Sequence, residues 1–278
     1  MSPRRTRIVV ALLMAPAAIG SVLYLPTPML AVLVAALMML GLWEWAQLAG
    51  LTSTPSRASY LIANALIMLA LVLAARGGPT LFTLELASVV GVGWWLLALL
   101  WLKNFDFAAG DGAGPRALKL LAGSLSVIPA WSAICWLHQS SILGPRWALF
   151  AVAIVWAADT GAYFVGVRFG KHKMAPRISP GKSWEGFFGG IAATLLLALL
   201  MRPMLHVPWS AVPMLLLLSV IAGLISVAGD LFESLLKRHA NMKDSSDLIP
   251  GHGGVLDRLD SLLAALPVFL VAKMWLGL

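Results

Sequence analysis

Long apolar runs recur from one end of this sequence to the other, and they restrict its fold more than any other feature. Runs long enough to cross the roughly 30 Å hydrocarbon core of a bilayer as α-helices recur along the chain. A bilayer admits only helices or closed barrels, because backbone polar groups there must be satisfied internally. Barrel strands alternate polar and apolar residues in short segments, whereas these runs are continuous. We therefore expect an all-α, polytopic integral membrane protein.

The runs predict about nine transmembrane helices, separated by turns and loops rich in Pro, Gly and charged residues. The expected spans are Ile8–Leu25, Met29–Leu48, Tyr60–Ala75, Leu86–Leu102, Ala117–Leu137, Trp147–Gly166, Phe187–Met201, Val212–Ala228 and Leu262–Leu276. Composition agrees, because 60% of the residues are hydrophobic and only 12% are charged, whereas about 25% charged is usual in soluble domains. The single cysteine, Cys135, lies inside an apolar run and is expected to be buried.

The distribution of Lys and Arg predicts the orientation in the membrane. With the N-terminus in the cytoplasm, the alternating loops place nearly all of these residues on the cytoplasmic side, as the positive-inside rule requires. The outside then carries only Arg76, Arg146, Arg202 and Lys273. The net charge of +8 is better explained by cationic loops facing anionic lipid than by a nucleic-acid partner, which we do not expect.

Acidic residues divide the chain into two parts. Most of them lie in the second half: Asp159, Glu185, Asp230, Glu233, Asp244, Asp247, Asp257 and Asp260. We expect residues 1–140 to be a structural half, able to supply a dimer contact, and residues 141–278 to be the catalytic half. No internal repeat is evident, which argues against an inverted-repeat transporter.

The most crowded charges lie between Ser234 and Ser261. If the preceding helix continues past the membrane, one polar stripe carries Asp230, Glu233, Ser234 and Lys237, at spacings of three and four residues. Such a stripe fits a site with carboxylates, a hydroxyl and an ammonium group. It also fits a solvated helix face with a salt bridge.

A glycine-rich turn around His252, with Gly253 and Gly254, precedes Asp257 and Asp260. Glycines let backbone amides approach an anion, and a helix start adds partial positive charge. Carboxylates alone would repel phosphates, so this combination indicates a divalent metal between them. Mg²⁺ takes oxygen ligands from both groups. The alternative is a helix start that is simply capped by acids. The pattern favours a cytoplasm-facing, metal-dependent site for a phosphorylated substrate.

Two earlier stretches are candidates for the same site. Asp159 shares a helix face with Tyr163, and an ionisable side chain at membrane depth is by default functional or paired, unless it reaches interfacial water. Lys182 and Ser183 follow a Pro-Gly turn and could donate to phosphate. The Gly-Lys-Ser string is not a nucleotide-binding P-loop, because the first Gly and the preceding strand are missing. An ordinary amphipathic loop with an interfacial Trp also fits this stretch.

The segment from Ser234 to Asp260 resembles the signature of phosphatidate cytidylyltransferases, also called CDP-diglyceride synthases. The signature positions are filled without a gap by Ser234, Leu236, Lys237, Arg238, Lys243, Asp244, Ser246, Ile249, Pro250, His252, Gly253, Gly254, Val255, Asp257, Arg258, Leu259 and Asp260. Asp159–Tyr163 and Ser179–Gly186 also resemble the family, except that Gly181 replaces a basic residue and Ser183 stands where Thr is common. The first 140 residues resemble it only in general hydropathy.

The resemblance implies a nucleotidyltransferase of phospholipid biosynthesis that converts CTP and phosphatidate to CDP-diacylglycerol and pyrophosphate. It implies a Mg²⁺ requirement, with one or two ions, and a homodimer in the bacterial inner membrane with its site facing the cytoplasm. Expected metal ligands are Asp230, Asp257 and Asp260. Expected catalytic residues are Asp257, Asp230, Lys237, Asp244 and Arg258. Expected substrate-binding residues are Lys182, Ser183, Ser234, Arg238, Lys243, His252, Gly253, Gly254, Asp159 and Tyr163.

Two other functions compete with this one. A CTP-dependent lipid-alcohol kinase would also sit in the membrane, but it would release CDP. An ion-coupled transporter could use Asp159 and Glu44 as intramembrane carboxylates, although the charges cluster in loops on one side rather than at the midplane. Glu44 lies between Trp43 and Trp45, and we expect it near a membrane interface.

Overall fold

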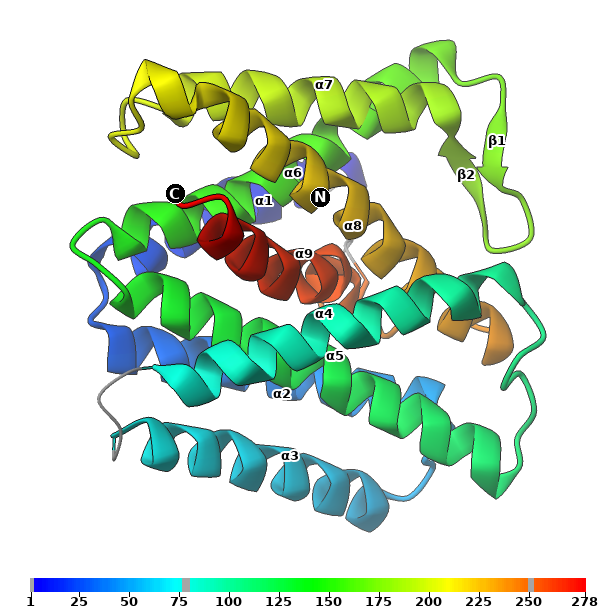
Figure 1. The fold of residues 1–278 in the computed structure, drawn as a ribbon. Coiled ribbons are helices and arrows are strands. Elements are labelled where there is room, and N and C mark those ends of the chain that lie inside the picture. The colour runs from blue at the N-terminus through cyan, green and yellow to red at the C-terminus, as the bar shows by residue number, and fades with distance from the viewer. Residues whose placement is uncertain (1–2, 77–80, 250–252) are drawn as a thin grey trace.

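The computed structural model describes residues 3–76, 81–249 and 253–278. Within these ranges the chain forms nine α-helices, one short 3₁₀-helix and a two-stranded sheet (Figure 1). The helices are α1 (Pro3–Tyr24), α2 (Thr27–Leu48), α3 (Thr54–Arg76), α4 (Phe82–Lys103), α5 (Ala113–Gln139), α6 (Gly144–Phe169), α7 (Trp184–Met201), α8 (Val212–His239) and α9 (Leu256–Trp275). The 3₁₀-helix is η1 (Trp209–Ala211), and the strands are β1 (Lys173–Ala175) and β2 (Ser179–Ser183).

The class of membrane protein expected from the apolar runs is confirmed. In the described part of the chain, seven helices, α2 to α8, are long and apolar enough to cross a bilayer. The first turns of helix α9 carry Asp257, Arg258 and Asp260, so its apolar part is shorter. The count of nine spans and the cytoplasmic N-terminus stay predictions.

A small antiparallel hairpin joins α6 to α7 and is the main departure from an all-α fold. Lys173 pairs with Ser183, and Ala175 pairs with Ser179. The sequence did not predict these strands, because three and five residues are too few to show a period of two, and Pro and Gly in β2 are depleted in strands. The hairpin carries Lys182 toward α8.

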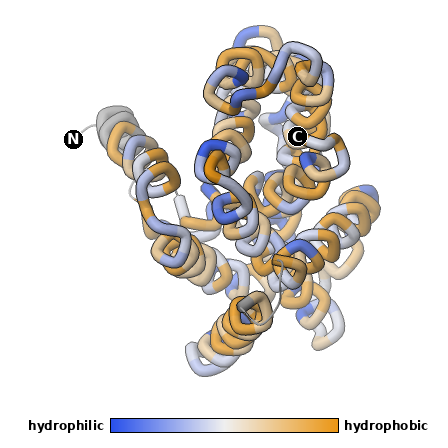
Figure 2. Tube along the Cα trace, turned by 60° about the vertical axis from the view of Figure 1, so that its left-hand side comes forward, coloured by the Kyte–Doolittle hydropathy of each residue, from blue (hydrophilic) through white to orange (hydrophobic). Residues whose placement is uncertain are grey.

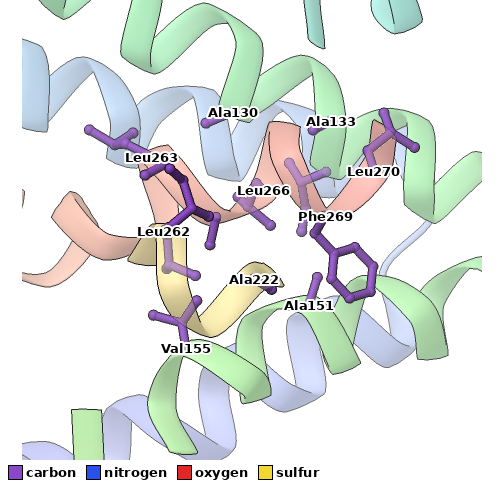
Figure 3. Close-up of a cluster of buried hydrophobic side chains, with 14 of the residues drawn as sticks. Ala130, Ala133, Ala151, Val155, Ala222, Leu262, Leu263, Leu266, Phe269 and Leu270 are labelled. Atoms are coloured by element: carbon purple, nitrogen blue, oxygen red, sulfur yellow. The ribbon is translucent and has the colours of Figure 1, made fainter. Parts of the chain in front are cut away.

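Helix α9 lies in the middle of the bundle, with α6, α7 and α8 on one side and α3, α4 and α5 on the other (Figure 1). Its buried side chains include Leu262, Leu263, Leu266, Phe269 and Leu270. They face small residues of neighbouring helices (Figure 3): Ala130 and Ala133 of α5, Ala151 of α6 and Ala222 of α8. Small residues let helix backbones approach closely in a bilayer. Packing on several sides therefore holds the helix that begins with Asp257 and Asp260.

Apolar side chains also cover much of the outer surface. Hydrophobic residues lie along the outer sides of the helices as well as between them (Figure 2). On α4, for example, Leu96, Leu97 and Leu100 are 59%, 61% and 60% exposed. A continuous apolar surface of this kind is typical of contact with lipid rather than with water.

The α9 core gives a stability prediction. Phe269 is fully buried, and its ring centroid lies 5.8 Å from that of Phe150 in an edge-on arrangement. We expect Phe269→Ala to lower the free energy of unfolding by about 3 kcal/mol, because it leaves a cavity. Thermal unfolding in detergent measures this loss. Trp275→Ala, at a 90% exposed position of the same helix, is the control, and an equal loss in both variants would contradict the prediction.

Candidate active site

A cavity of about 610 Å³ opens where α6, α7 and α8 meet the hairpin and the start of α9. Acidic and basic side chains from α6, the hairpin, α8, the connection from α8 to α9 and the start of α9 line it. They are Asp159, Lys182, Asp230, Lys237, Asp244, Asp257, Arg258 and Asp260, and the lining also includes Tyr163 and Ser183. Residues that are about 100 positions apart in the sequence therefore meet at one cavity, as the sequence predicted for a single site.

Asp257 is the most firmly held carboxylate of the cavity. Its Oδ1 accepts a hydrogen bond of 2.6 Å from Lys237 Nζ. Its Oδ2 accepts from the Gly254 amide at 2.8 Å and from the amide and hydroxyl of Ser245, each at 3.0 Å. Both oxygens are thus fixed, with the side chain only 7% exposed. This carboxylate is oriented by the protein rather than by solvent.

Lys237 links two acidic residues in the interior. Its Nζ lies 2.6 Å from Asp257 Oδ1 and 3.2 Å from Glu233 Oε1, one helical turn away on α8. The exposed fractions of the Lys237 and Glu233 side chains are 10% and 1%. This burial excludes a solvated face as the explanation of the polar stripe on α8. Ser234 belongs to the same stripe and donates to Asp230 Oδ1 over 3.3 Å.

The hairpin closes one side of the cavity. Lys182 of β2 reaches α8, where its Nζ lies 2.7 Å from Asp230 Oδ2. Ser183 follows as the N-cap of α7, its hydroxyl oxygen accepting from the Gly186 amide at 3.2 Å. The stretch therefore belongs to the cavity instead of being a detached amphipathic loop.

Some predicted binding residues lie beside the cavity rather than in its lining. Arg238 donates to the backbone carbonyls of Ile178, at 3.1 Å, and Met242, at 3.4 Å, so it ties the end of α8 to the hairpin. Lys243 is exposed. Ser234 lies on the α8 stripe, next to the lining. His252, predicted to bind substrate, falls outside the described residues.

Gly253 and Gly254 have a structural reason to be glycine. Gly253 has a φ of +79°, which side-chain-bearing residues rarely adopt. A Cβ on Gly254 would collide with the Ser245 hydroxyl and with Glu44 Oε2. The glycines therefore let the backbone pass close enough for the Gly254 amide to reach Asp257.

The carboxylates offer donor chemistry that suits Mg²⁺. Among the residues that the structure describes, no group of three or more His, Cys, Asp or Glu side chains lies close enough together to hold a metal ion by itself. Mg²⁺ does not need one, because it is usually held by one or two carboxylates together with water and substrate phosphates. Asp230, Asp257 and Asp260 present hard oxygen atoms to the same cavity, so this donor set fits the ion.

Glu44 contributes to the structure around the cavity, a role that the sequence did not predict. It lies near the end of α2, in the first half of the chain, and is only 3% exposed. Its carboxylate accepts hydrogen bonds from residues just before and at the start of α9. The signal that could have found it is an acidic residue within an apolar helix, and its position near a membrane interface stays a prediction.

The fold and the cavity define an integral membrane protein with a polar site suited to phosphorylated substrates. Its sequence matches the cytidylyltransferase family over residues 5–275. It is 41% identical over 271 residues to the phosphatidate cytidylyltransferase of Pseudomonas aeruginosa, a match that covers 98% of this chain and 97% of that protein. The Haemophilus influenzae protein of the same name is 39% identical over 269 residues, covering 91% and 93%.

A more distant relative extends the same similarity. The phosphatidate cytidylyltransferase of Bacillus subtilis is 33% identical over 229 residues, covering 69% of this chain and 84% of that protein. The chain therefore belongs to the cytidylyltransferase family. The resemblance drawn from the Ser234–Asp260 signature and the prediction of a nucleotidyltransferase are both confirmed.

Proposed function

We propose that this protein transfers the cytidylyl group of CTP to phosphatidate, which yields CDP-diacylglycerol and pyrophosphate for phospholipid synthesis. One observation carries the proposal: Lys182, Lys237 and Arg258 line the same cavity as Asp230 and Asp257. The cations suit phosphate groups, and the carboxylates suit a metal ion between phosphates. The shared name of the relatives supports phosphatidate as the acceptor.

The reaction requires that the two substrates are positioned and that their negative charges are neutralised, more than it requires proton transfer. A phosphatidate oxygen attacks the α-phosphorus of CTP, a new P–O–P bond forms, and the bond to pyrophosphate breaks. The attacking oxygen is already anionic, so no strong general base is required. Oriented cations that meet developing negative charge lower the barrier. In this proposal Lys182 and Arg258 hold phosphate groups, and Lys237 keeps Asp257 in its orientation through the 2.6 Å contact.

We propose Asp230, Asp257 and Asp260 as ligands of one or two Mg²⁺ ions. Such an ion supplies Lewis-acid stabilisation of the phosphoryl oxygens. Lys182 contacts Asp230 and is placed to exchange this carboxylate for a nucleotide phosphate. Asp159 and Asp244 line the cavity and would organise cations and substrate there. The same proposal assigns Tyr163 and Ser183 to substrate contacts.

We also propose the orientation, the cellular location and the oligomeric state of the protein. The site faces the cytoplasm, where the loops rich in Lys and Arg lie under the positive-inside rule, and the N-terminus is cytoplasmic. The bacterial relatives support an inner-membrane location. The protein would act as a homodimer, with residues 1–140 as the structural half and residues 141–278 as the catalytic half.

Product analysis of the purified protein tests the proposed reaction. Incubation in detergent micelles with CTP, phosphatidate and Mg²⁺ should release pyrophosphate in amounts equal to the CDP-diacylglycerol formed. Chelation of the divalent ions should stop the release, and added Mg²⁺ should restore it. Release of CDP would instead indicate a lipid kinase. Ion flux in liposomes without any dependence on CTP would indicate a transporter.

A further inference from the structure

We infer that Glu44 is a positioning residue that sets the orientation of Asp257 from the opposite half of the chain. The inference rests on the proposed function of Asp257 in cytidylyl transfer. Glu44 is not part of the cavity lining, so it acts through the backbone and side chains that hold Asp257 and not by touching substrate.

The Glu44 carboxylate is saturated with donors from one segment. Its Oε1 accepts from Ser246 Oγ at 2.6 Å and from the Val255 amide at 3.1 Å. Its Oε2 accepts from Ser245 Oγ at 2.8 Å and from the Leu256 amide at 2.7 Å. Each oxygen thus lies within hydrogen-bond distance of one hydroxyl and one amide. The glutamate therefore clamps the serine pair to the start of α9.

The two amides explain why an acidic residue suits this place. Val255 is the N-cap residue of α9, and Leu256 is its first residue, where backbone amides lack partners within the helix. A negative charge next to a helix start is stabilising. No side chain of the N-cap residue itself satisfies these donors. Glu44 supplies the cap from α2 instead.

The same serine connects the clamp to the catalytic carboxylate. Ser245 Oγ lies 2.8 Å from Glu44 Oε2 and 3.0 Å from Asp257 Oδ2. A hydroxyl has one proton to donate, so the two carboxylates compete for it, while the Ser245 amide donates to Asp257 Oδ2 in either case. Glu44 thereby fixes the position of Ser245, which contacts Asp257, and of the first turn of α9, which carries Asp257.

The burial of Glu44 argues against the view that its contacts with the start of α9 are incidental. Moving a charged carboxylate out of water is unfavourable unless hydrogen bonds compensate for the lost hydration. At Glu44 four donors provide that compensation, and all four belong to the segment that presents Asp257. The contact spans more than 200 residues of sequence, so it joins the two halves at the site.

Glu44→Gln is the sharpest test, because it keeps the shape and replaces one acceptor oxygen by a donor. One pair of donors then faces an NH₂ group. We expect kcat to fall by about tenfold or more, with the KM for CTP changed less than threefold. The Mg²⁺ concentration for half-maximal rate should rise, because Asp257 is no longer held in place. Glu44→Asp, which keeps the charge, should recover part of the rate.

Glu85→Gln is the matched control, since it makes the same chemical change in the first turn of α4 and should leave kcat and the Mg²⁺ dependence unaltered. Hydrogen exchange supplies a readout that does not need turnover: peptides containing Val255 and Leu256 should exchange faster in Glu44→Gln than in the unaltered protein. Unchanged exchange would overturn the inference, even if the unaltered protein makes no CDP-diacylglycerol. Faster exchange with full activity and unchanged Mg²⁺ dependence would reduce Glu44 to a structural cap and also overturn it.

Discussion

Asp257→Asn is expected to lower the rate of CDP-diacylglycerol formation by about a thousandfold or more, a loss of the size seen when a group that stabilises transition-state charge is removed. The carboxylate is proposed to hold Mg²⁺, and an amide is a much weaker ligand for a hard cation. The amide also presents an NH₂ group toward donors that now converge on Asp257 from Lys237, Gly254 and Ser245. Membrane insertion should be unaffected, because the apolar part of α9 is unchanged.

The rate should be measured with CTP, phosphatidate and Mg²⁺ at saturating concentrations, on protein whose amount in the membrane fraction has been determined. Asp247→Asn is the matched control, since it makes the same change at an exposed position of the same segment outside the cavity lining. We expect it to keep nearly the full rate. If Asp257→Asn retains more than about a tenth of the rate, the proposed role of Asp257 in metal binding is wrong.

Lys237→Met should cause the largest loss of stability among single changes at the site, about 3–5 kcal/mol, the range for removing one partner of a buried ion pair. Glu233 and Asp257 would keep their carboxylates in a place where the side chains are 1% and 7% exposed, without the ammonium group between them. The two buried carboxylates would then lack a counter-charge, and turnover should fall because Asp257 loses the donor to its Oδ1.

Unfolding in detergent, followed by tryptophan fluorescence, measures the loss of stability. Lys103→Met, at an exposed position at the end of α4, should change stability little. Adding Glu233→Gln to Lys237→Met should recover part of the loss, since one of the two buried charges is removed. If the double variant is no more stable than Lys237→Met, the missing counter-charge is not the cause of the loss.

The helices could be predicted from the sequence because the bilayer leaves so few alternatives. Every expected span corresponds to a helix of the structure, and the helices extend past the apolar runs where polar residues continue the same backbone, as on α8 from Asp230 to Lys237. The polar stripe on α8 was predicted from helical spacing alone. The convergence of Asp159, Lys182 and Asp257 on one cavity followed from placing their loops and helix ends on the same side of the membrane.

Other features depend on tertiary packing and leave little trace in local sequence. Glu44 and Ser245 lie 201 positions apart, and no helical or strand period relates them. Arg238 stays a predicted substrate-binding residue, and the sequence did not show that it also donates to two backbone carbonyls, one of them in the turn of the hairpin. The hairpin itself is too short for a periodic pattern. Partners of this kind are fixed only when the helices pack.

The fate of each phosphate of CTP tests the central proposal most directly. Purified protein should be given phosphatidate, Mg²⁺ and CTP that carries radioactive phosphorus either at the α-phosphate or at the γ-phosphate. Cytidylyl transfer should place the α label in the lipid product and release the γ label as pyrophosphate. Transfer of the γ label to the lipid, with the α label recovered in CDP, would contradict cytidylyl transfer and establish a kinase instead.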